Sequence, residues 1–102
     1  MEDIHSIFTR FKEEFPKVHE LHSALGKEIH EASGPLDEKA RWLIKVAVSA
    51  ACEHKRALQT HIRRAKAAGV TDAEIKHALL LVIPTSGFPA FMKAYAVLDG
   101  VK

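Results

Sequence analysis

Hydrophobic residues recur at helical spacing over the first third of this chain. One stripe consists of Ile4, Ile7, Phe8 and Phe11. A second stripe, after Pro16, consists of Val18, Leu21, Leu25 and Ile29. Steps of three and four residues place side chains on one helix face, so both stretches are predicted to be amphipathic helices. Pro16 separates them because the residue before a proline avoids the helical region, and Gly34-Pro35 ends the second helix.

Two later segments are apolar on almost every face. They run from Ala40 to Ala51 and from Ala78 to Ile83. Asp37 is placed to cap the start of the first segment. A helix that is apolar all round is buried, and six short helices cannot cover both segments fully. We therefore predict a homo-oligomer in which partner subunits cover part of these helices.

Cap and break signals define the remaining helices. Thr71-Asp72-Ala73-Glu74 predicts a capping box at a helix start, and Gly69 ends the helix before it. Pro84 is expected to break the apolar run, and a last helix extends from about Pro89 to Leu98. No stretch alternates as a strand does. The chain is therefore predicted to be all-α, with about six helices in a single domain over residues 1–102.

Composition and charge narrow the classes of function. The 102 residues include 15 basic and 13 acidic side chains, for a formal net charge of +2. That charge is too mild to indicate a nucleic-acid or membrane partner. One basic cluster has no interleaved aromatic residues and is interpreted as a solvated helix face: Lys55, Arg56, Arg63, Arg64 and Lys66. The polar start and the short apolar runs predict neither a signal peptide nor a membrane span.

The single cysteine, Cys52, excludes an internal disulfide, and a reducing cytoplasm is the expected location. The pattern places Cys52 at the start of the helix that carries His61, close to His54. A thiol at a helix N-terminus has a lowered pKa, because the terminal amides favour the thiolate. A cysteine after two alanines is more often a small buried hydrophobe, and this interpretation is favoured.

His61 is the histidine that the pattern singles out. It lies within an apolar stripe, one turn from Leu58 and from Ala65, so it faces the core or a pocket. A core histidine that donates to a carbonyl is the more common case, and catalysis is the alternative. His19 and His22 could share a metal ion, but no motif supplies further ligands. We therefore expect neither a metal nor a cofactor.

A run of motifs covers the second half of the chain: Leu43 to Ala51, His61 to Ala65, Ala68 to Ile75 and Ser86 to Pro89. The signature His-Ile-x-x-Ala-x-x-x-Gly-Val-Thr-x-x-Glu-Ile, followed by Gly-Phe-Pro, resembles the carboxymuconolactone decarboxylase and alkylhydroperoxidase-D superfamily. The resemblance extends over nearly the whole length. It implies a helical bundle that assembles into trimers or hexamers, with a pocket near His61 for a small-molecule substrate.

One arm of this superfamily reduces hydroperoxides with a cysteine pair, a histidine and a glutamate. With its histidine on His61, the cysteines fall on His54 and Ala57, and the glutamate falls on Trp42. Cys52 lies two residues upstream, on a different helix face. A dithiol peroxidase is therefore not expected. The decarboxylase arm lacks the cysteine pair and keeps a histidine that His61 matches.

Three functions remain open. The first is a cofactor-free enzyme for a small organic acid or lactone, with His61 as general acid or base and His54 or a basic side chain orienting the carboxylate. Its pocket would be lined by Trp42 and Phe88. The second is a one-cysteine peroxidase in which His54 activates Cys52. The third is a non-enzymatic oligomer that binds a ligand or partner, and the missing cysteine pair favours the first or the third.

Overall fold

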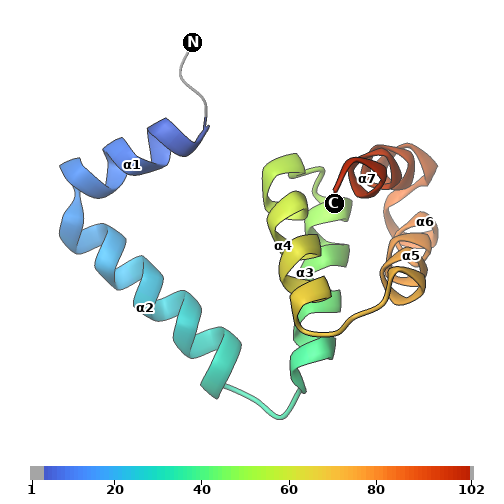
Figure 1. The fold of residues 1–102 in the computed structure, drawn as a ribbon, viewed down its shortest axis with the longest axis horizontal. Helices are drawn as coiled ribbons and strands as arrows, with labels where there is room; N and C mark the ends of the chain where they lie inside the picture. Colours follow the sequence, from blue (N-terminus) through green and yellow to red (C-terminus); the bar gives the residue numbers. More distant parts are fainter. Residues whose placement is uncertain (1–3, 102) are drawn as a thin grey trace. The chain divides into compact units, whose positions relative to one another are not determined.

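The computed structural model describes residues 4–101. This range contains helices joined by short turns and no strand (Figure 1). The helices are α1 (Ile4–Glu14), α2 (Pro16–Ala32), α3 (Glu38–Ala51), α4 (Lys55–Ala67), α5 (Asp72–Leu80), α6 (Ile83–Ser86) and α7 (Phe88–Gly100). Six of these described helices have nine or more residues, and α6 is a single turn of four. The predicted all-α fold of about six helices is confirmed.

The chain divides into two compact units, Met1–Pro35 and Leu36–Lys102. In the first unit, α1 contacts α2 through aromatic side chains. The ring centroids of Phe8 and His19 lie 5.5 Å apart, and Phe11 lies 6.2 Å from the same histidine. Pro16 is the first residue of α2, so the predicted separation of the two helices is confirmed. That residues 1–102 act as one domain stays a prediction.

The second unit contains the hydrophobic core. Helix α3 contacts α4, α5 and α7, and α4 also contacts α7, as Figure 1 shows for the neighbouring ribbons. The largest side chains that are fully buried come from α3, α4 and α5: Val46, Ile62, Ile75 and Leu79. Because α4 buries one stripe against these neighbours, the face of α4 that carries His61 borders the core.

The cap signals of the second unit are confirmed. The Asp37 carboxylate accepts from the backbone amide of Ala40 at 2.8 Å. Thr71 and Glu74 form the capping box, with the Glu74 amide donating to the threonine hydroxyl at 3.1 Å. Gly69 follows the end of α4 with φ of 92°, a left-handed conformation that glycine adopts without steric cost.

One predicted detail differs, and another stays a prediction. Helix α5 ends at Leu80, before Pro84, and Pro84 lies in the first turn of α6. A proline is tolerated in a first turn, because the amide that it lacks has no partner within the helix there. The segments expected to be apolar and buried are exposed along one side in the single chain, with Ile44 48 % and Val48 56 % exposed. Coverage of that side by a partner subunit stays a prediction.

Candidate functional site

His61 and Ser49 form a hydrogen bond between side chains of two different helices. The Ser49 hydroxyl and the Nδ1 atom of His61 lie 2.8 Å apart and link α3 to α4. Ser49 is 4 % exposed, while His61 is half-buried. A buried hydroxyl needs a hydrogen-bond partner, and here the imidazole provides it. The pair therefore fixes the orientation of the His61 ring at the edge of the core.

Two further side chains of α3 lie on the face that carries Ser49. Trp42, Lys45 and Ser49 are spaced by three and four residues, which places them on one helix face. The ring centroids of Trp42 and His61 are 6.0 Å apart, and the Lys45 ammonium lies 5.0 Å from the centroid of the indole. A cation at this distance is attracted to the electron-rich face of the indole ring. An aromatic ring and a cation thus flank the imidazole.

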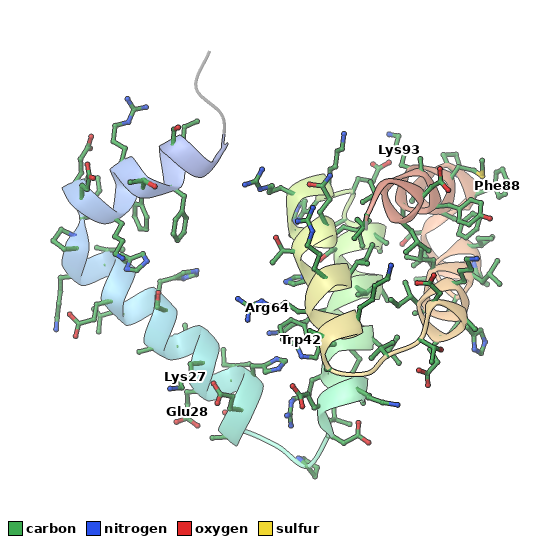
Figure 2. All side chains as sticks on the ribbon, in the orientation of Figure 1. Lys27, Glu28, Trp42, Arg64, Phe88 and Lys93 are labelled. Carbon is green, nitrogen blue, oxygen red and sulfur yellow. The ribbon has the colours of Figure 1, made fainter. Side chains whose placement is uncertain are left out.

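Two features of α3 lower the pKa of Lys45. Burial lowers the pKa of the Lys45 ammonium from its ordinary 10.5, and the Arg41 guanidinium lowers this pKa further. Figure 2 shows Arg64 of α4 and Trp42 projecting on the side of the two helices away from α7. The half-buried imidazole therefore lies in an electropositive setting, which suits an anionic ligand.

The predicted position of Cys52 at the start of α4 is wrong. Cys52 is the C-terminal cap of α3, and α4 begins at Lys55 after its N-cap, His54. Helix α3 ends in a Schellman motif: the amide of His54 donates to the Ser49 carbonyl at 2.9 Å, and Glu53 has a left-handed φ of 58°. The argument that a helix start activates the thiol therefore does not apply, although Cys52 is exposed.

The structure brings only part of the predicted site together. Trp42 and His61 are neighbours, whereas Phe88 begins α7 and lies at the opposite edge of the second unit in Figure 2. His54 is seven residues before His61, about 10 Å along the axis of α4, so the two rings do not share a hydrogen bond. His54 and Phe88 therefore lie outside the group around His61 within one chain.

Sequence reasoning missed Ser49 and Lys45. Their signal was the spacing of the two polar residues that follow Trp42 within the apolar part of α3, at three and seven positions after it. That they meet His61 depends on the packing of α3 against α4. Within residues 4–101, no three histidine, cysteine or acidic side chains are grouped closely enough to hold a metal ion. No helix of that range is long and apolar enough to cross a membrane.

Comparison with known proteins identifies the fold. The model of the carboxymuconolactone decarboxylase family matches residues 16–100. The chain belongs to this family. It is also 32 % identical over 89 residues to an uncharacterized protein of Methanocaldococcus jannaschii, an alignment that covers 86 % of this chain and 85 % of that protein. The resemblance read from the motifs around His61 is thereby confirmed.

Some members of this superfamily use a cysteine pair and a glutamate for redox chemistry, and other residues occupy those positions in the resemblance. With the histidine of the peroxidase arm placed on His61, the resemblance puts His54 and Ala57 at the cysteine positions and Trp42 at the glutamate position. In this family member the indole packs beside the imidazole instead of a carboxylate. The buried Ser49 of α3 hydrogen-bonds to the same imidazole.

Proposed function

We propose that this family member is a cofactor-free enzyme that acts on a small organic acid or lactone, with His61 as general acid or base. The observation that carries the proposal is the 2.8 Å contact between the Ser49 hydroxyl and His61 Nδ1. An imidazole held in one orientation can exchange a proton with a bound substrate repeatedly without losing its alignment. Ser49 is nearly buried and acts as a positioning residue rather than as a nucleophile.

The neighbours of His61 support an anionic substrate. Lys45 and Arg64 supply positive charge on the Trp42 side of α3 and α4, and the indole supplies an apolar surface. When a carboxylate leaves as carbon dioxide, its bonding electron pair remains on the substrate carbon, which must then take up a proton. An imidazolium at His61 can deliver that proton while a lysine ammonium compensates the transient negative charge.

The first test replaces the imidazole. His61→Asn keeps a polar side chain that can accept or donate to Ser49, so the fold should survive while turnover of carboxymuconolactone falls by at least about 100-fold. Loss of substrate absorbance and release of carbon dioxide measure the turnover. His77→Asn, at an exposed histidine of α5, is the matched control and should keep wild-type turnover. Equal turnover of the His61→Asn and wild-type proteins would remove His61 from the mechanism.

The second test addresses the positioning role of Ser49. Ser49→Ala removes the hydroxyl that contacts the Nδ1 atom of His61. We expect kcat to fall by about tenfold and the pH–rate profile to shift, with little change in KM. Ser49→Thr, which restores a hydroxyl, should recover part of the rate. A change in stability alone, with an unaltered pH–rate profile, would show that the hydrogen bond is only structural.

The alternative of a one-cysteine peroxidase rests on the exposure of Cys52. We expect no dithiol-type reduction of hydroperoxides, because one sulfur cannot form the internal disulfide that resolves the sulfenic acid. Reduced protein, cumene hydroperoxide and an excess of dithiol provide the assay. Turnover well above that of a Cys52→Ser control would put the peroxidase first. Binding of the acid without turnover would instead favour the non-enzymatic alternative.

The proposal extends to assembly and location. We propose that the chain forms a homotrimer or hexamer, since two apolar residues of α3 remain exposed in the single chain: Ile44 and Val48. In such an assembly a partner subunit would cover these exposed residues of α3. We also propose that the protein is located in the cytoplasm.

A further inference from the structure

A cavity of about 350 Å³ lies where the end of α3 and the start of α4 meet α7. It is lined by Ala50, Glu53, Lys55, Leu58, Lys93, Ala94, Ala96 and Val97. None of the residues grouped around His61 is among them, so the cavity is separate from the proposed catalytic group. Its volume is at the lower end of the range for pockets that hold small organic ligands.

The floor of the cavity is apolar and belongs to the core. Ala50, Leu58 and Ala94 belong to the core, and each is almost completely buried. Ala50 on α3 and Ala94 on α7 leave the space open, because an alanine fills far less volume than the other apolar residues of these helices. An apolar floor of this kind suits the hydrocarbon part of a ligand, whose burial removes apolar surface from water.

The rim of the cavity is charged. Glu53 accepts from the Lys93 ammonium at 2.8 Å, and Lys55 is the second ammonium at the rim. Glu53 occupies the left-handed position of the turn after α3, where glycine would be free of steric cost. An exposed ion pair contributes little to stability, so stability does not explain a glutamate at this position. Its side chain instead holds Lys93 at the edge of the cavity.

We propose that this cavity binds a small carboxylic acid with an unbranched aliphatic body. Two ammonium groups and one carboxylate at the rim leave one positive charge unmatched, which a ligand carboxylate would neutralise at Lys55 and Lys93. The aliphatic chain of the ligand lies over this floor and against the more accessible apolar residues of the lining, Ala96 and Val97. The site is independent of the reaction proposed for His61.

The test titrates the whole chain with octanoate and follows backbone amide shifts by NMR. We expect the shifts to concentrate on the lining residues of α3, α4 and α7. Octylamine, which has the same chain and the opposite charge, should bind at least about tenfold more weakly. Equal binding of octylamine and octanoate would overturn the proposal, as would shifts that spread over residues outside the lining or no shifts at millimolar octanoate.

Variants at the rim keep the test independent of folding, because the substituted residues are exposed. Lys55→Met should weaken octanoate binding by about tenfold, since a charge-assisted hydrogen bond is lost. Ala96→Phe should obstruct the cavity and weaken binding by a similar factor. Lys76→Met, at an exposed lysine of α5 outside the lining, is the matched control and should bind as wild type does. Undiminished affinity for octanoate in both Lys55→Met and Ala96→Phe would contradict the proposed binding site.

Discussion

The two compact units of this chain have equally clear helical patterns and very different burial. Helix α2, with 17 residues, has no buried residue, and its apolar stripe is more than half exposed: Val18, Leu21, Leu25 and Ile29. Helix α4, with 13 residues, buries Leu58, Ile62 and Ala65. An apolar stripe therefore indicates that a helix has a face to bury, but it does not say which surface will cover that face.

The difference matters because isolated helices of this length are marginal in water. In the second unit, packing of α3, α4, α5 and α7 supplies the stabilising burial. Within the first unit, α1 and α2 contact each other mainly through the aromatic rings around His19. We therefore expect the first unit to contribute less to the stability of a single chain than the second unit does.

The largest expected effect is a difference in stability cost between truncating an apolar side chain in the second unit and truncating one in the first. Ile62→Ala removes a fully buried side chain and should lower the free energy of unfolding by about 2–5 kcal/mol. Leu25→Ala, on a residue that is 58 % exposed, should cost less than about 1 kcal/mol in dilute protein. Urea unfolding followed by circular dichroism measures both. Equal costs at low protein concentration would show that the stripe of α2 is buried within a single chain.

Assembly gives the second-largest expected effect. We expect wild-type protein to sediment as a trimer or hexamer at micromolar concentration. Leu25→Glu in α2 and Val48→Glu in α3 each place a charge on an exposed apolar face and should weaken assembly by at least about tenfold. Lys27→Glu, on the polar face of α2, is the matched control. A wild-type monomer would contradict the proposed oligomer and leave both faces uncovered.

Helix starts also differ between the units. Helix α2 begins without a capping side chain, whereas α5 begins with the box formed by Thr71 and Glu74. Thr71→Ala should lower the free energy of unfolding by about 1 kcal/mol, because the Glu74 amide loses its acceptor. Thr60→Ala, at an exposed interior position of α4, should change it by no more than about 0.5 kcal/mol. Similar losses in the two variants would show that the box contributes nothing.

The smallest expected effect is a pH dependence of the same cap. The Thr71 amide, followed by the Thr71 hydroxyl, lowers the pKa of Glu74 from its ordinary 4.5. Because the folded pKa lies below the unfolded one, this contribution is complete above about pH 4.5 and is lost as the pH falls through the folded value. Glu74→Gln should therefore lose less stability than wild type between pH 7 and pH 3. Equal losses in the two proteins would contradict this contribution.

The ends of α3 and α4 show which helix ends can be predicted from the local sequence. Helix α4 ends in a Schellman motif with Gly69 in the left-handed position, and the glycine made that end predictable. Helix α3 ends in the same motif, but its left-handed residue is Glu53. Glutamate gives no signal for a left-handed turn, so the sequence pattern places Cys52 in the next helix. The error about the thiol follows from that one residue.

Periodicity, prolines and caps determined the helices and most of the buried positions, because these features depend on residues within one or two turns of each other. Ile62 and the capping box at Thr71 could both be read in this way. The site required more. Ser49 and His61 are 12 residues apart in the sequence. They meet only because the buried faces of α3 and α4 pack against each other. Which side chain becomes the partner of a histidine depends on the register of that packing, and the register is set by all the buried residues of the second unit together.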